Sequence, residues 1–205
     1  MKLWTIQNIE AYKLLKKNGI LHANEEYLWC RDGNNLIRAY DWMASELGKK
    51  DARPDGVNYP IWAWYQWEGK RKKRDMRESG LSARGDLIVQ LEIEIPDEKV
   101  LLSDFDLFHC VLNNMYVSLS KEDCDQFDKW YESLGIKYDD LEYDASQDEK
   151  LQRVEKAIVE SWAGVFDLTK EDDNWLGKNE QKSIQAVFWE LREDQVIWAR
   201  EFLAK

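Results

Sequence analysis

The nine residues from Tyr59 to Trp67, YPIWAWYQW, constrain the fold more than any other stretch of the chain. Three of the eleven tryptophans and two of the nine tyrosines lie within them. Aromatic and β-branched residues favour strands, on which successive side chains point to opposite faces. Because rings fall on both faces, both faces must be covered. The pattern predicts either a central strand buried by helices or a strand with one face forming the floor of a ligand pocket.

The rest of the chain alternates strand patterns with amphipathic helix patterns. Strands are predicted over residues 2–7, 20–22, 86–95, 100–103, 183–191 and 196–203. Residues 196–203 also fit a helical stripe, but their alternation favours a strand. Helices are predicted after Asn8 and over 34–47, 104–113, 120–134 and 150–162, with Gly48 ending the second. Together these patterns predict an α+β fold with a mixed, largely antiparallel sheet and helices packed around it. We expect a single domain over residues 1–205.

A basic loop follows the aromatic strand, from Gly69 to Arg84. Its basic residues outnumber Asp75 and Glu78, although the whole chain carries a net charge of −11. The loop is either a solvated turn or a lid that binds an anion, and phosphate suits the forked guanidinium of arginine. The acidic remainder of the chain disfavours nucleic acid as a partner. The basic residues are Lys70, Arg71, Lys72, Lys73, Arg74, Arg77 and Arg84.

Cysteine usage and hydropathy indicate a cytoplasmic protein. Cys30, Cys110 and Cys124 are odd in number and form no CxxC pair, which is typical of reduced thiols. With His22 and His109 beside them, they predict no metal site. No apolar run is long enough for a membrane span, and the first residues meet polar side chains too early for a secretory signal.

Two pairs of titratable residues are candidates for proton transfer. Asp106 and His109 lie three residues apart on a predicted helix, as a base and its orienting carboxylate would. Glu92 and Glu94 share one face of a predicted strand. A polar helix face or a solvated strand face would give the same patterns. The common phosphate-loop, dinucleotide, metalloprotease and hydrolase motifs are absent from the sequence.

Four segments resemble the uncharacterised bacterial family catalogued as domain of unknown function 3841. They are LWTIQ near the start, YPIWAWYQW, LEIEIPDEKVLLSDFDLFHCVLN and IQAVFWEL near the end. This resemblance covers nearly the whole chain and implies no established activity.

The layout also resembles the ADP-ribosyltransferase fold, in particular the DNA-targeting toxins. This resemblance places Thr5 and Gln7 in a first strand that meets the nicotinamide ribose, and the basic loop over NAD. It places Gln185 and Ala186 in a late strand that carries the catalytic glutamate in a QAE setting. Here the glutamate position is Val187, which cannot stabilise a developing oxocarbenium ion. The resemblance therefore implies a shared fold with lost or rearranged chemistry.

Two functions follow as hypotheses. The first is a divergent or degenerate ADP-ribosyltransferase-like domain that binds NAD or another nucleotide between the aromatic strand and the basic loop. The second is a non-catalytic protein-interaction module, for instance in a bacterial or phage conflict system. In the nucleotide-binding hypothesis, the ribose would contact Thr5 and Gln7. The ring would stack on Trp62, Trp64 or Tyr65, and the phosphates would bind Arg71, Arg74 or Arg77. Gln185 and His109 are the catalytic candidates.

Overall fold

The computed structural model describes residues 1–23, 34–136, 148–172 and 174–205. These residues form two compact units. The sheet unit comprises Met1–Ser103 and Ser183–Lys205, and the helical unit comprises Asp104–Lys182. The helical unit is therefore an insertion in the sequence of the sheet unit. That residues 1–205 form one domain stays a prediction.

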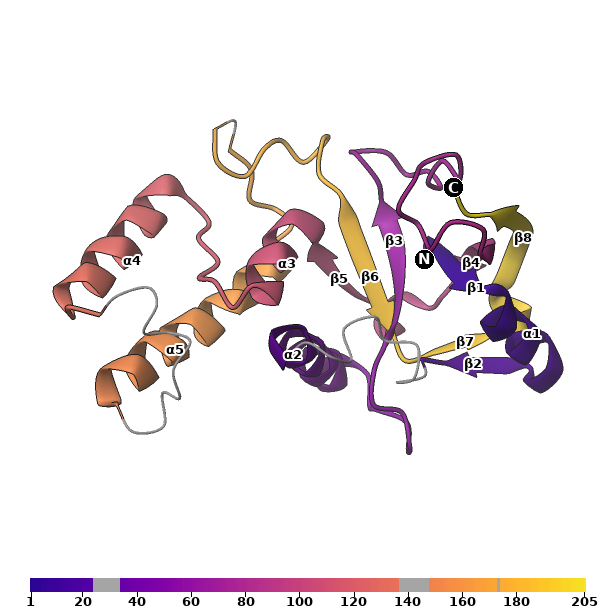
Figure 1. Cartoon of the computed structure of the whole chain (residues 1–205), viewed down its shortest axis with the longest axis horizontal. Coiled ribbons are helices and arrows are strands. Elements are labelled where there is room, and N and C mark those ends of the chain that lie inside the picture. Colours follow the sequence, from indigo (N-terminus) through magenta and orange to yellow (C-terminus); the bar gives the residue numbers. More distant parts are fainter. Residues whose placement is uncertain (24–33, 137–147, 173) are drawn as a thin grey trace. The chain divides into compact units, whose positions relative to one another are not determined.

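A six-stranded sheet organises the sheet unit (Figure 1). Its strands lie in the order β5-β6-β3-β1-β4-β8, and β2 and β7 form a second, two-stranded sheet. The registered strand pairs are antiparallel, which confirms the predicted α+β class with a largely antiparallel sheet. The aromatic strand β3 lies inside the sheet, between β6 and β1. The bounds are β1 Lys2–Asn8, β2 Ile20–His22, β3 Ile61–Gln66, β4 Leu87–Glu94, β5 Leu101–Asp104, β6 Ile184–Phe188, β7 Glu190–Arg192 and β8 Val196–Leu203.

Two helices belong to the sheet unit, α1 (Ile9–Asn18) and α2 (Asn34–Lys50). The Asn8 side chain accepts a hydrogen bond from the backbone N–H of Ala11 at 2.6 Å and so caps α1, as predicted. The predicted end of α2 at Gly48 is wrong, because the helix continues to Lys50. Glycine inside a helix costs only about 1 kcal/mol, and burial of the neighbouring Leu47 favours continuation.

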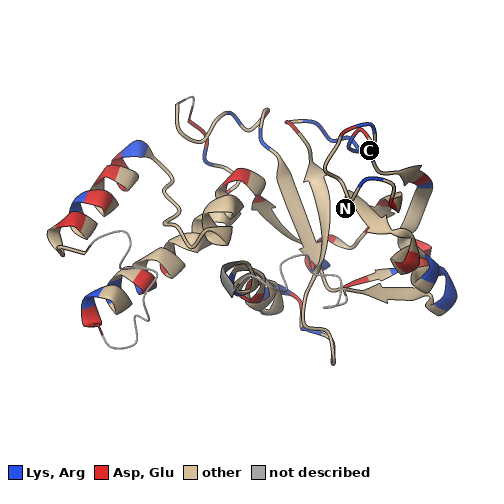
Figure 2. Cartoon of the chain, in the orientation of Figure 1, with Lys and Arg blue, Asp and Glu red and all other residues tan. Residues whose placement is uncertain are grey.

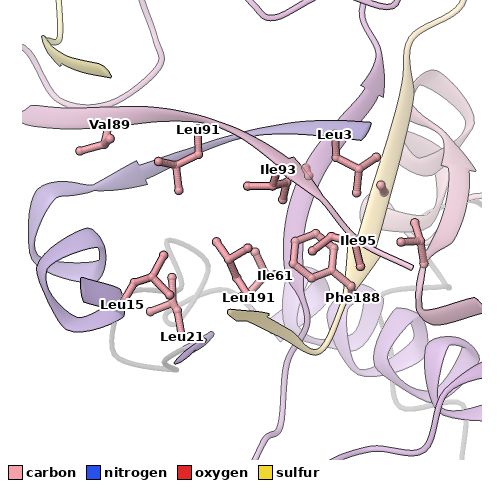
Figure 3. Packing of buried hydrophobic residues seen from close by; sticks show 13 residues of the cluster. Leu3, Leu15, Leu21, Ile61, Val89, Leu91, Ile93, Ile95, Phe188 and Leu191 are labelled. Carbon is pink, nitrogen blue, oxygen red and sulfur yellow. The ribbon is translucent and has the colours of Figure 1, made fainter. Parts of the chain in front are cut away.

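One face of the main sheet carries the larger hydrophobic core. Alternate side chains of β1 and β4, among them Leu3, Val89 and Leu91, are buried there. Figure 3 shows these side chains facing Leu15 of α1, and Leu21 and Leu191 of the small sheet. The core face is thus covered by α1 and by the β2–β7 pair.

The opposite face of the sheet carries Trp62, Trp64 and Gln90. Gln90 is buried, and its side-chain amide donates to the backbone oxygen of Arg74 at 2.8 Å. A smaller core of Met76, Ile88 and Ala204 lies on this side, with Leu81 packed against it. Because Met76 and Leu81 belong to the basic loop, this loop covers part of the second face.

The helical unit contains α3 (Phe105–Leu112), α4 (Lys121–Ser133) and α5 (Glu149–Ser161), followed by a 3-10 turn at Trp162–Phe166. The Trp162 indole is buried and donates to the backbone oxygen of Met115 at 3.0 Å. Ser120 caps α4 by accepting from the N–H of Asp123. Large aromatic residues of α4, such as Phe127 and Trp130, are only half-buried. Within the described residues, no helix has the length and apolar character required to cross a membrane.

A buried ion pair joins the two ends of the helical unit. The ammonium of Lys182 lies 3.2 Å from the carboxylate of Asp104, and both side chains are 3% exposed. Asp104 also caps α3 by accepting from the N–H groups of Asp106 and Leu107. Lys182 donates in addition to the backbone oxygen of Lys170 at 2.7 Å. Each charge is therefore hydrogen-bonded as well as paired, which a buried ion pair requires.

Candidate functional site

The candidate site begins where β1 and β3 separate. The ladder between them registers Trp4 with Trp64, whereas β1 stays paired with β4 from Lys2 to Asn8. Past Trp4, the Thr5 hydroxyl donates to the backbone oxygen of Trp62 at 2.8 Å. A side-chain hydrogen bond thus takes the place of a ladder bond, and the two strands part at this point.

A cavity of about 360 Å³, which we name the β1–β3 cavity, lies at this separation. Its size falls within the range of roughly 300–1,000 Å³ that is usual for small-molecule sites. Three strands and the basic loop contribute to it, and all of its residues belong to the sheet unit. It is lined by Thr5, Ile6, Trp62, Ala63, Trp64, Arg74, Gly80, Leu81 and Gln185.

Four of the predicted ligand-binding residues and one of the two catalytic candidates line this cavity. They are Thr5, Trp62, Trp64, Arg74 and Gln185. Trp64 lies opposite both Trp4 and Gln185 in the sheet, so these three residues share one face. The structure therefore brings an aromatic surface, an amide, a hydroxyl and a guanidinium together from segments far apart in the sequence.

Arg74 is held over Trp64 of β3 and over Trp67, which follows this strand. Its guanidinium carbon lies 4.0 Å from the ring centroid of Trp67 and 5.7 Å from that of Trp64. These two rings meet edge to face, with centroids 4.6 Å apart. Glu78 also holds Arg74, since its carboxylate lies 2.7 Å from Nη2. Cation–π contacts and an ion pair thus fix the guanidinium at the edge of the cavity.

Gln185 is the buried amide of the cavity. Its side chain is 5% exposed, and the part of the chain that the structure describes supplies no acceptor for its buried Nε2. Buried polar groups in folded proteins nearly always have a hydrogen-bond partner. The Gln185 amide can therefore donate to a molecule that occupies the cavity. An amide cannot act as a general base, so Gln185 suits a binding role better than a catalytic one.

The other predicted ligand residues of the sheet unit lie outside the cavity lining. Gln7 donates to the Thr5 hydroxyl at 2.8 Å and so supports a lining residue. Tyr65 lies on the core side of β3, where the Arg71 guanidinium stacks on its ring at 3.6 Å. Arg71 also donates to the backbone oxygens of Tyr65 and Lys2. Arg77 is 82% exposed and makes a bidentate contact with Asp75.

His109 belongs to the helical unit and is not among the residues that line the cavity. Its Nδ1 lies 2.9 Å from the backbone oxygen of Phe105, one turn earlier in α3. Among the described contacts there is no hydrogen bond between His109 and Asp106. Burial raises the pKa of Asp106, and the neighbouring Asp104 raises it further. That Asp106 orients His109 as a base stays a prediction.

Glu92, the other proton-transfer candidate, is held in its charged form. It accepts from Lys2 at 2.7 Å and from the Trp4 indole at 3.1 Å. These hydrogen bonds, that of Lys2 first, lower the pKa of the Glu92 carboxyl. A carboxylate with a lowered pKa is a poor general acid or base at neutral pH. Glu94 is exposed at the end of β4.

Val187 occupies the place where the transferase resemblance implies a glutamate. It pairs with Trp62, two residues along β6 from Gln185, and is fully buried. The described side chains that line the cavity include no carboxylate, imidazole or thiol. The arrangement can hold a ring and donate hydrogen bonds to the acceptors of a ligand.

Four lining residues were missed by the sequence analysis, namely Ile6, Ala63, Gly80 and Leu81. Gly80 takes a positive φ of 80°, a conformation that favours glycine, and precedes Leu81 in the second core. A glycine followed by an isolated leucine in a charged loop was the available signal. Leu81 packs against the second core and so ties the basic loop (Figure 2) to the sheet.

The fold and the cavity define an α+β protein with a largely antiparallel sheet and an aromatic cavity between two of its central strands. The chain belongs to the family described as a domain of unknown function, DUF3841, whose pattern matches residues 2–197. No curated protein and no solved structure matches the chain.

Proposed function

We propose that the protein binds a nucleotide in the β1–β3 cavity, with NAD and ADP-ribose as the first ligands to test. The observation that carries this proposal is the cavity itself, where Trp62 and Trp64 meet Arg74 and the unsatisfied amide of Gln185. Tryptophan faces stack on planar rings, while guanidinium and amide donors suit phosphate and carbonyl oxygens. A nucleotide combines these two chemistries.

The proposed activity is binding without turnover. Transfer from NAD needs a group that stabilises the developing positive charge on the ribose, and Val187 cannot do so. Thr5 already donates to one backbone oxygen and accepts from Gln7, so its hydroxyl is largely engaged. The domain would then be a degenerate relative of an ADP-ribosyltransferase that keeps the ligand and has lost the reaction.

The test is a calorimetric titration of the purified protein with NAD and ADP-ribose. We expect saturable binding that weakens about tenfold in Trp64→Leu, because stacking on one ring contributes roughly 1–3 kcal/mol per base. Trp175→Leu is the matched control, since Trp175 is a half-exposed tryptophan of the helical unit. Unchanged affinity in a folded Trp64→Leu variant, or no binding at millimolar ligand, would contradict the proposal.

The alternative, a protein-interaction module that uses the basic loop, ranks second. Several cations of the loop already have contacts within the sheet unit. Arg71 stacks on Tyr65, Lys73 lies over Trp198, and Arg77 pairs with Asp75. These contacts leave less of the loop's charge available to an acidic partner.

A further inference from the structure

The polar groups that lack partners at the β1–β3 cavity are hydrogen-bond donors. Nε2 of Gln185 and Nε of Arg74 are both buried, and the described residues place no acceptor on either atom. A guanidinium has donors only, so Arg74 can be satisfied only by an acceptor. The cavity therefore favours a ligand that presents oxygen acceptors, and a negative charge on them would strengthen both contacts.

Arg74 makes several contacts besides its ion pair with Glu78. Its backbone oxygen accepts from the buried Gln90, and its guanidinium lies on the rings of Trp67 and Trp64. The side chain is 20% exposed. The contacts with the two rings would therefore remain if the carboxylate on Nη2 were displaced.

Glu78 is the carboxylate on Nη2, at 2.7 Å, and its side chain is 38% exposed. Glu78 belongs to the same loop, four residues after Arg74. Among the described contacts, its side chain would lose this ion pair alone on rotating into solvent. Glu78 thus satisfies the guanidinium in the way that an anionic group of a ligand would.

We infer that Glu78 is an internal competitor for Arg74, and that the ligand of the β1–β3 cavity carries an anionic group, phosphate or carboxylate, that displaces it. This inference rests on the proposed nucleotide-binding function. It adds that the cavity distinguishes ligands that carry an anionic group from ligands that do not. A ligand that carries both a ring and an anionic group must replace the Glu78 carboxylate on Arg74, and this exchange lowers its affinity. A ligand with a ring alone is unaffected by Glu78.

The experiment compares ADP-ribose, which carries a diphosphate, with adenosine, which carries none, by calorimetry on the full chain. In Glu78→Gln we expect ADP-ribose to bind about fivefold tighter, the scale of a partly exposed ion pair, and adenosine to bind as in the wild type. Nicotinate and nicotinamide form a second pair of probes, which separates a carboxylate from a phosphate as the anion.

Glu68→Gln is the matched control. Glu68 lies in the same segment after β3, its carboxylate is 3.8 Å from Lys72, and its neutralisation changes the net charge equally. We expect no gain in this variant. The wild type, the two single variants and the double variant form a double-mutant cycle, which isolates the coupling between Arg74 and Glu78. When Arg74→Gln is already present, adding Glu78→Gln should no longer increase the affinity for ADP-ribose.

Three outcomes would overturn the inference. If the wild type binds ADP-ribose but Glu78→Gln binds it no tighter, the competition is wrong and nucleotide binding stands. An equal gain in Glu68→Gln would show a general charge effect and would have the same consequence. If neither the wild type nor Glu78→Gln binds any of the four probes at millimolar concentration, the inference fails together with the proposed function.

Discussion

Single polar side chains determine what the β1–β3 cavity can do. The Thr5 hydroxyl bridges the strands where their ladder stops, and the Gln185 amide faces the cavity with an unsatisfied donor. Neither residue is a base, and the neighbouring Val187 is apolar. The cavity is therefore suited to recognition through hydrogen-bond donors and rings.

The buried pair of Asp104 and Lys182 gives a prediction at the residue scale. Asp104→Asn preserves the cap of α3, because asparagine caps as well as aspartate, but leaves the Lys182 ammonium without its carboxylate. We expect the free energy of unfolding to fall by about 3 kcal/mol, the cost of breaking a buried pair by removing one partner. Urea denaturation followed by circular dichroism measures this change.

Asp148→Asn is the control for that experiment. Asp148 caps α5 through the N–H groups of Lys150 and Leu151, as Asp104 caps α3, but it is exposed. We expect its replacement to change the free energy of unfolding by only about 0.5 kcal/mol or less, as is usual for surface substitutions. Equal losses in both variants would show that capping, and not the buried charge, accounts for the effect.

At the scale of elements, the aromatic strand was predictable because its two faces follow from alternation. Ile61 and Ala63 are buried on the core side, and Trp62 and Trp64 lie on the other face. The alternation fails after Trp64, where the register with β6 shifts. Trp67 contacts Trp64, although strict alternation would place these two rings on opposite faces. A bulge of this kind depends on the partner strand and leaves little trace in the sequence.

The basic loop shows what sequence patterns cannot resolve. Arg71, Arg74 and Arg77 are equivalent in the sequence, yet Arg74 alone of the three lines the β1–β3 cavity. The difference arises from long-range contacts, since Arg71 bonds to the backbone of Lys2 and Arg74 is tied to Gln90 of β4. Residues 196–203 were ambiguous for the same reason, and pairing with β4 makes them a strand.

The glycine inside α2 gives a prediction for that helix. A Cβ on Gly48 would lie 4.0 Å from Cζ2 of Trp189, an ordinary van der Waals distance. Gly48→Ala should therefore stabilise the protein by about 0.5–1 kcal/mol, because alanine has the higher helix propensity. Thermal unfolding of the two proteins tests this, and a lower midpoint for Gly48→Ala would contradict it.

Gly164→Ala is the opposite case. A Cβ there would lie 3.2 Å from side-chain atoms of Val117 and Leu119, so these residues would have to shift. We expect this variant to unfold at a lower temperature than the wild type, since overpacking a well-filled site is destabilising.

For the whole molecule, the helical unit is an insertion whose ends are held together by Asp104 and Lys182. Replacing residues 104–182 with a short Gly-Ser linker should therefore leave the sheet unit folded, because β5 and β6 are neighbours in the sheet. We expect cooperative unfolding of the shortened protein and unchanged affinity for ADP-ribose. A shortened protein that fails to fold would show instead that residues 1–205 form one domain.

The position of β6 also has a consequence for synthesis. β6 lies between β5 and β3, but its residues 184–188 emerge from the ribosome after the whole helical unit. At translation rates of about 5–20 residues per second, one edge of the aromatic strand β3 stays unpaired for several seconds. An unpaired, ring-rich strand edge readily pairs with other chains. Nascent chains that stall before Ser183 would therefore be the form of this protein most dependent on chaperones.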